Sequence, residues 1–248
     1  MNAGGISKFH APLWLGISLA IGLILSTIII ANTVTKVKLA NQTITVKGYA
    51  ERRIKSDFIV WRGVFSTRGE RLTDAYASLD KDLSSVKEYL ASKGVAEDSL
   101  IVSSIRTKTF YARDERGMPT EKLSGFELEQ EVEIRSNAVE KITAIAREST
   151  ELIRKGVQFQ SLPPQYFYTK LGELKIDILA EATKDAKQRA EQLALNSGCK
   201  VGTLRSATMG VLQITKAYST EVSDYGIYDI SSLEKDVKAV VTVSFSID

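Results

Sequence analysis

Four glutamates in one short stretch are the densest group of side chains that could do chemistry. Residues 126–134 alternate apolar and polar positions, which on an extended strand places on one face Glu127, Glu129, Glu131 and Glu133. Carboxylates are ligands that Ca²⁺ and Mg²⁺ prefer, but next-but-one side chains on a strand lie roughly 6–7 Å apart, too far to share one ion without other ligands. A preceding strand carries Arg106 and Lys108 on a single face, so we interpret the glutamates as a solvated face crossed by basic neighbours and predict no metal site.

Other reactive side chains are scarce. The chain of 248 residues has one cysteine, Cys199, and one histidine, His10. An intrachain disulfide, a zinc site of the cysteine–histidine type and a catalytic triad with a histidine in the soluble part are therefore excluded. Cys199 follows Gly198 at the end of an expected helix, where the helix dipole disfavours a thiolate. We predict no catalytic residue and no cofactor, and expect a protein that is not an enzyme.

The overall composition narrows the class further. Hydrophobic residues make up 44% of the chain and charged residues 25%, which is typical of a globular protein and excludes a disordered or multi-pass membrane protein. Lys and Arg number 33 against 30 Asp and Glu, a net charge of +3. Nucleic-acid-binding domains carry a larger or more concentrated basic surplus, so we expect no nucleic-acid partner.

The elements that must position these residues follow from the hydrophobic period. Alternating segments predict strands at 43–49, 57–67, 100–111, 124–135 and 237–247, with short candidates at 165–169 and 211–214. Helical spacing predicts a long helix at 72–90 that Gly94 ends, a shorter one at 139–153 capped by Ser136 or Asn137, and a long one at 171–196. The polar turn at 113–119 predicts a long hairpin. The fold class is therefore α+β, with mostly antiparallel strands, two long helices and one shorter helix.

One face of the last long helix is unusual. A candidate packing or assembly stripe runs along it through Leu174, Ile178, Ala182, Ala186, Ala190 and Leu193. Its middle is alanine, and small residues let another backbone approach closely. The neighbour is either the sheet of the same domain or another subunit.

An apolar segment near the N-terminus predicts a membrane anchor. Residues 9–35 contain no charged residue, and the 19-residue centre at 13–31 would span roughly 28 Å as a helix, close to the hydrocarbon core of a bilayer. The anchor residues are Leu13, Trp14, Leu15, Ile21, Leu23, Ile24, Leu25, Ile28, Ile29 and Ile30. A cleaved signal peptide is the alternative, although its apolar region would be shorter.

The chain then divides into four parts. They are a short tail at 1–8, the anchor at 9–35, a linker at 36–41 and one domain at 42–248. Within that domain residues 217–236 are polar, tyrosine-rich and aperiodic, which predicts a mobile loop. Lysines flank the anchor on both sides, so charge alone leaves its orientation open.

Several segments resemble the SIMPL-domain (DUF541) family. Residues 43–51 followed by Ser56-Asp57 are similar to its opening motif, Gly125-Phe126 to the start of its acidic strand, and residues 181–194 to its most recognisable helix. The likeness covers 42–248. Two positions depart from the family pattern, with Ser56 where proline is usual and Tyr49 where glycine is common.

The resemblance implies a role and a location. Members of the family are mostly bacterial, exported or envelope-anchored, are not known as enzymes, and some assemble into homo-oligomeric rings. We therefore expect a SIMPL-type domain anchored by a single pass in the inner (cytoplasmic) membrane, with the domain in the periplasm, acting as a ring-like envelope scaffold. The alternative is an anchored sensor or binding module that uses the tyrosine-rich loop, with an unknown small-molecule ligand or a protein partner.

Overall fold

The structure, a computed structural model, describes residues 10–40 and 42–247. The chain forms two units: the first runs to Ala50 and takes in Leu179–Gly210 and the chain from Ala239, and the second is Glu51–Ile178 with Val211–Lys238. The helices are α1 His10–Ala40, α2 Leu72–Ser92, α3 Val139–Glu148, α4 Glu151–Arg154 and α5 Leu171–Asn196. The strands are β1 Thr43–Lys55, β2 Phe58–Gly69, β3 Leu100–Val102, β4 Arg106–Arg113, β5 Pro119–Ser136, β6 Gln158–Ser161, β7 Gln165–Phe167, β8 Val201–Met209, β9 Gln213–Lys216, β10 Ile227–Tyr228 and β11 Glu234–Ile247.

The predicted fold class is confirmed. The helices α2 and α5 are long and α3 is shorter, while α4 adds a single turn. Among the described strand pairs, β9 and β10 run parallel and the others for which a register is given are antiparallel. The bounds of α5 agree with the prediction to the residue, because an amphipathic stripe and a terminal glycine mark its length clearly.

Helix α1 carries the predicted anchor. Its segment Leu15–Val34 is long and apolar enough to cross a membrane, by length and composition, and a signal sequence would pass the same criterion. The anchor side chains that the structure describes are exposed on the helix, namely Leu15, Ile21, Leu23, Ile24, Leu25, Ile28, Ile29 and Ile30. Leu13 and Trp14 are helical, but their side chains lie outside the described residues, as does the predicted tail at 1–8. Residues 36–40, predicted as linker, continue the helix because no glycine or proline interrupts them.

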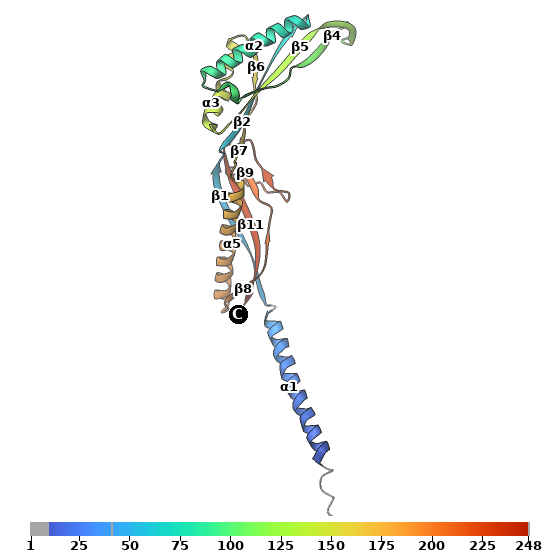
Figure 1. Cartoon of the computed structure of the whole chain (residues 1–248), viewed down its shortest axis with the longest axis vertical. Helices are drawn as coiled ribbons and strands as arrows, with labels where there is room; N and C mark the ends of the chain where they lie inside the picture. The colour runs from blue at the N-terminus through green and yellow to red at the C-terminus, as the bar shows by residue number, and fades with distance from the viewer. Residues whose placement is uncertain (1–9, 41, 248) are drawn as a thin grey trace, which may run out of the picture. The chain divides into compact units, whose positions relative to one another are not determined.

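In the first unit β11 lies between β1 and β8, and α5 runs beside β1 and β11 (Figure 1). Helix and strand approach closely at Gly48. A Cβ built there would lie 2.1 Å from the carbonyl oxygen of Ala182 and 2.7 Å from the Cβ of Ala186. The alanines of the stripe are therefore packed against the sheet of their own chain, which was one of the two alternatives that the sequence left open.

The stripe is buried along most of its length. Five predicted members are between 0 and 3% exposed, namely Leu174, Ile178, Ala182, Ala186 and Ala190. Leu193, the predicted last member, is 52% exposed, and Ala194 takes its place at 3%. The buried residues of α5 recur every four positions from Leu174 to Ala194. Leu193 comes three positions after Ala190, so it turns away from this buried line.

The second unit is built on the six-stranded sheet, with order β3-β5-β2-β6, in which β4 also pairs with β5 and β7 with β2. Helices α2 and α3 cover one face of it (Figure 1). Alternate residues of β2 enter the core, with Ile59, Trp61 and Phe65 almost completely buried, and Gly63 leaves room between them for the ring of Phe159. The other face of the sheet carries the predicted glutamates.

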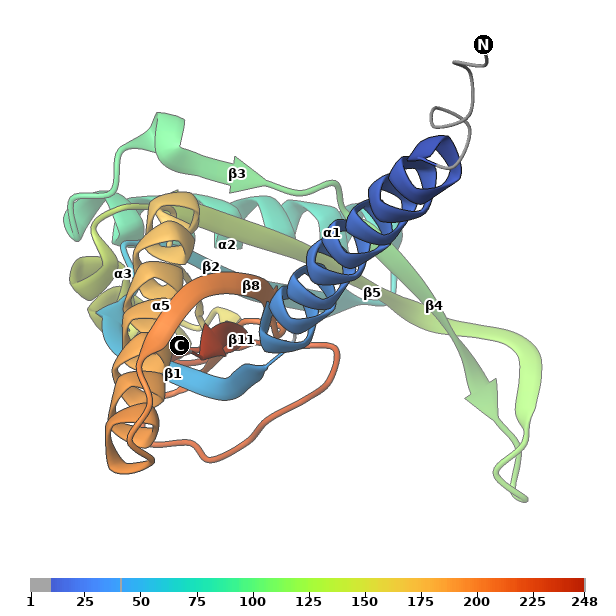
Figure 2. The ribbon, with the colours of Figure 1, turned by 90° about the horizontal axis from the view of Figure 1, so that it is seen from below.

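Strands β4 and β5 form the predicted hairpin. It continues past Gly69, the end of β2, as a two-stranded extension (Figure 2). From Arg106 to Ser124 every residue is exposed except the half-buried Ala112.

Local differences from the prediction have identifiable causes. The strand predicted at 100–111 is split into β3 and β4, because side chains replace backbone bonds of the ladder at Ser103. The amide of Glu131 donates to the hydroxyl of Ser103 at 3.0 Å, and the side-chain amide of Gln130 donates to the carbonyl of Ser103 at 2.8 Å. The helix predicted at 139–153 is split into α3 and α4 at Ser149, whose buried hydroxyl donates to the carbonyl of Ala146 and competes with the helix.

The predicted cap of that helix is wrong. Ala138 is the N-cap and has no side-chain capping bond. The hydroxyl of Ser136 accepts a bond from the amide of Ala138, and the side-chain amide of Asn137 donates to the carbonyl of Asp57, so both are engaged elsewhere.

Three of the described strands, β6, β8 and β10, lie where none was predicted, and two others are displaced. The candidate at 211–214 proves to be β9, and β11 begins three residues earlier than predicted. The segment 217–236, predicted as a loop, includes β10, which pairs with β9, and the first residues of β11.

Candidate functional site

The glutamates of β5 form an ion-pair ladder with the two neighbouring strands. On one side β2 supplies Arg62 and Arg68, and on the other β4 supplies the two cations that the sequence analysis placed there. The Nε atom of Arg62 lies 2.5 Å from an Oε atom of Glu133, and that of Arg68 lies 3.0 Å from one of Glu127.

The pairing with β4 is confirmed. The Nη2 atom of Arg106 lies 2.7 Å from Glu129, and the Nζ atom of Lys108 lies 3.4 Å from Glu129 and 3.8 Å from Glu127. Each of these glutamates thus meets cations from the flanking strands, as opposite charges across a sheet should.

The description of the ladder as solvated is wrong for two of its members. Glu127 is 9% exposed, because Arg68 of β2 and Lys108 of β4 lie over it from both sides. Glu133 is 8% exposed, because Arg62 of β2 and Arg135 of its own strand lie over it. Burial opposes ionisation of Glu133, but hydrogen bonds from Arg62 and Arg135 outweigh it and hold the pKa of its carboxyl below the ordinary value. All four glutamates have basic partners within 4 Å, so the ladder is a structural feature of the sheet.

The contacts of the ladder predict that substitution of two of its glutamates, Glu133 and Glu131, lowers the free energy of unfolding by different amounts. Glu133→Gln should lower the free energy of unfolding by about 1–2 kcal/mol, because two charge-assisted bonds to a buried carboxylate are lost. Glu131→Gln, the matched control, should cost less than about 0.5 kcal/mol, because its contact with Arg62 is 3.4 Å long. Urea unfolding of the full chain in mild detergent measures both. Equal costs would contradict this assignment.

The stabilisation by Glu133 also depends on pH. Since the folded pKa of Glu133 is lowered, its contribution to the free energy of unfolding is present above the unfolded pKa, about 4.3, and declines as pH falls below it.

The side chains that could bind a metal ion and the single thiol are further candidates for chemistry. Among the described residues, 10–40 and 42–247, no group of three or more His, Cys, Asp or Glu is placed to hold a metal ion. The sulfur of Cys199 is half-buried and lies 3.7 Å from the carbonyl oxygen of Ser197.

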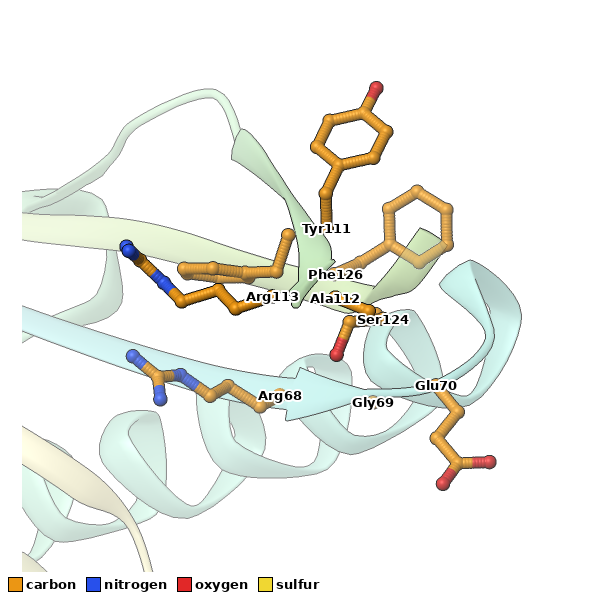
Figure 3. A pocket seen from close by; sticks show the side chains of 10 residues that line it. Arg68, Gly69, Glu70, Tyr111, Ala112, Arg113, Ser124 and Phe126 are labelled. Carbon is orange, nitrogen blue, oxygen red and sulfur yellow. The ribbon is translucent and has the colours of Figure 1, made fainter. Parts of the chain in front are cut away.

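A groove with a volume of about 560 Å³ opens where β2 ends and the hairpin continues (Figure 3). We call it the hairpin groove, and it is lined by residues 68–70, 110–113 and 124–126. Gly125 shapes it, since its φ of +152° disturbs the register with β4, and a Cβ there would lie 2.9 Å from the carbonyl oxygen of Gly69. The bend at Gly125 and the end of β2 together leave the groove open.

The two arginine side chains of the hairpin groove extend toward one end, and Glu70 lies apart from them. In Figure 3 the guanidinium groups of Arg68 and Arg113 reach toward the same end, away from the rings of Tyr111 and Phe126. The guanidinium carbon of Arg68 lies 5.0 Å from the ring centroid of Phe110, which holds it over the groove. An Nη atom of Arg113 donates to the carbonyl of Gly117, 2.8 Å away. Within residues 10–40 and 42–247 the other N–H groups of this guanidinium have no hydrogen-bond or ion-pair partner, so they can bind an anion.

A second feature of the same unit is the tyrosine loop, residues 217–226. Its base is fixed by Asp236, which is 2% exposed and accepts bonds from the amide of Tyr218 at 2.7 Å and from the Nε of Arg53 at 2.9 Å. The hydrogen bond from Arg53 is the main reason that the pKa of Asp236 lies below its ordinary value. Beyond this base Tyr225 is 96% exposed.

Sequence reasoning singled out neither the groove nor the fixed base of the loop. Isolated glycines within strand patterns mark bulges or close backbone approach, so Gly69 and Gly125 were a usable signal for the groove. Arg53 and Asp236 are 183 positions apart, and nothing local in the sequence connects them.

Comparison with known proteins agrees with the resemblance read from the sequence. The family model described as "SIMPL: Protein of unknown function (DUF541)" matches residues 44–245. No curated protein matches the chain. The matched range contains all but the terminal residues of the two sheets, together with the glutamate ladder, the hairpin groove and the tyrosine loop. Because the match covers most of the chain, the protein belongs to the SIMPL (DUF541) family.

Proposed function

We propose that the protein is a non-enzymatic, single-pass membrane protein whose soluble domain assembles with further copies into a ring-like scaffold of the cell envelope. The anchor is α1, inserted in the inner membrane, and the domain lies on the periplasmic side. Family membership and the apolar segment Leu15–Val34 support this location.

The exposed hairpin is the observation that carries the proposal. Its strands and turn expose four large apolar side chains to 38% or more, namely Phe110, Tyr111, Met118 and Leu123. Within the described residues β4 pairs with β5 alone, so the outer edge of β4 is a row of backbone groups open to another chain. Apolar side chains beside an open strand edge are typical of interaction surfaces. A single anchor per chain confines copies to one membrane plane, which raises their effective concentration and favours lateral contacts.

The test uses the full chain extracted from membranes in mild detergent. Mass photometry should show a closed oligomer, and N-terminal sequencing of the same sample should begin at Met1 or Asn2 because the anchor is retained. A Tyr111→Ser, Leu123→Ser variant should dissociate, whereas Ile176→Ser, at a 72% exposed position of α5, should not. Monomers for the unaltered chain at concentrations above those in the membrane extract would overturn the proposal, and a start at Asn32 would overturn the anchor.

A second function is favoured by the tyrosine loop. Because Asp236 holds its base and leaves Tyr225 exposed, the loop could present a fixed surface to a ligand or partner, as in an anchored sensor. The size of the extracted protein separates the two functions, since a sensor acting alone remains monomeric.

A further inference from the structure

The tyrosine loop combines acidic and apolar side chains at its tip. Tyr218, Val222 and Tyr225 are 83%, 77% and 96% exposed. Glu221 and Asp224 stand among them, and neither carboxylate makes an ion pair in the described part of the chain. Large apolar side chains at this exposure, next to two open carboxylates, are what a docking segment needs.

The loop is held ready for contact. Besides the bond from Tyr218 to Asp236, the side-chain amide of Gln213 donates to the carbonyl of Ser223 at 2.7 Å, and the amide of Gly226 donates to the same carbonyl at 3.1 Å. These bonds fix both ends of the tip, so ordering it on binding costs little conformational entropy.

The hairpin groove has the complementary chemistry. Its two guanidinium groups, of Arg68 and Arg113, match the two carboxylates of the loop. Arg68 binds Glu127 through its Nε, and its side chain is still 67% exposed, so its Nη atoms can meet a second carboxylate. The aromatic rings of the groove match the valine and tyrosine of the loop. Arginine forms directional, charge-assisted bonds with carboxylates, and aromatic rings favour apolar and aromatic partners. None of the ten residues that line the groove belongs to the loop.

We propose that the hairpin groove of one copy binds the tyrosine loop of the next copy, an inference that rests on the assembly proposed above. The two surfaces use different residues, so the contact is head-to-tail, and each copy has one groove and one loop. Repeating such a contact produces a ring when the rotation closes. Anchors in a common membrane plane favour closure over an open filament that would leave the plane.

The first experiment places one cysteine on each surface. In a Cys199→Ser background, a Ser124→Cys chain and a Thr220→Cys chain are co-expressed with different tags, and their membranes are treated with a short bismaleimide. A cross-linked pair that carries both tags is expected. Ser84→Cys, an exposed serine of α2, replaces Thr220→Cys in the control and should give no such pair. Equal yields in the two samples, or no pair with Thr220→Cys, would overturn the inference.

The second experiment reverses charges. Arg113→Glu and Asp224→Arg should each raise the concentration at which the oligomer dissociates by about tenfold, and the chain that carries both should recover, because the pair is restored with opposite polarity. Lys122→Glu, on the same hairpin but outside the groove, is the matched control and should leave the oligomer unchanged. Melting temperatures of all variants separate loss of contact from loss of folding. Intact oligomers with both single reversals would overturn the inference and leave the scaffold proposal standing, whereas monomers of the unaltered chain would overturn both.

Discussion

Lys235→Met is expected to lower the free energy of unfolding by about 3 kcal/mol. The Lys235 side chain is 2% exposed, and its ammonium donates to the carboxylate of Asp229 at 3.3 Å and to the carbonyl of Ser232 at 2.6 Å. Methionine fills a similar volume without the charge, so Asp229 would be left 9% exposed without its cation. Breaking a buried ion pair by removing one partner is far more costly than replacing both. Thermal unfolding of the full chain in mild detergent measures the loss.

The control removes the second charge as well. With Lys235→Met and Asp229→Asn together, the loss should be smaller than the sum of the two single changes, because no uncompensated charge remains. Asparagine can keep some of the bonds from Ser231 and Ser232 that hold Asp229. Additive losses, or a single Lys235→Met loss below about 1 kcal/mol, would show that the pair does not stabilise the unit in this way.

Acid provides an independent readout of the same pair. Burial opposes ionisation of Asp229, but hydrogen bonds from Ser232 and Ser231 and the charge of Lys235 outweigh it and hold its pKa well below the ordinary value. A carboxyl with a lowered folded pKa stabilises fully above its unfolded pKa, about 3.9, and the stabilisation is lost as pH falls toward the folded pKa. The unaltered chain should therefore lose stability below about pH 4 more steeply than Asp229→Asn does.

Periodicity alone predicted the elements whose two faces meet different environments. Helix α5 shows this, since four-residue steps of small and apolar residues coincide with its buried face from Leu174 to Ala190. The apolar face of β5 was likewise predicted, with Leu128, Val132 and Ile134 at 2% exposure or less. In both cases the apolar residues of one local pattern pack into one core. The prediction of their burial therefore needs no information about residues far away in the sequence.

Elements without such a contrast were missed. Strand β8 is exposed from Thr203 to Met209, and among the described strands it pairs with β11 alone, so its sequence carries no alternation of burial. Short β6 offers four residues, too few for a period. The burial of Glu133 was missed for a different reason: it depends on Arg62, which β2 brings opposite it from 71 positions away. The register of two paired strands decides which side chains lie opposite each other. The sequence of either strand alone does not determine that register.

Gly48→Val is expected to lower the free energy of unfolding by about 3 kcal/mol or more, at the upper end of overpacking costs. Valine favours strands, so in open space the change would stabilise β1. The first side-chain atom alone would lie 2.1 Å from the carbonyl oxygen of Ala182 and 2.7 Å from Ala186, and backbone atoms cannot move aside as a flexible side chain could. Gly172→Ala, where a Cβ meets nothing within 4 Å on helix α5, is the matched control and should be neutral or slightly stabilising.

The oligomeric size of the Gly48→Val protein that remains folded tests whether the alanine stripe packs within one chain or between subunits. Because Ala182 and Ala186 are buried against the strand of their own chain, Gly48→Val should unfold at a lower temperature while the folded fraction keeps the oligomeric size of the unaltered chain. A folded Gly48→Val protein that dissociates would instead assign the stripe to a subunit contact. Retained size would place the proposed assembly elsewhere on the domain, which is consistent with the exposed hairpin proposed above, with its apolar side chains and open strand edge.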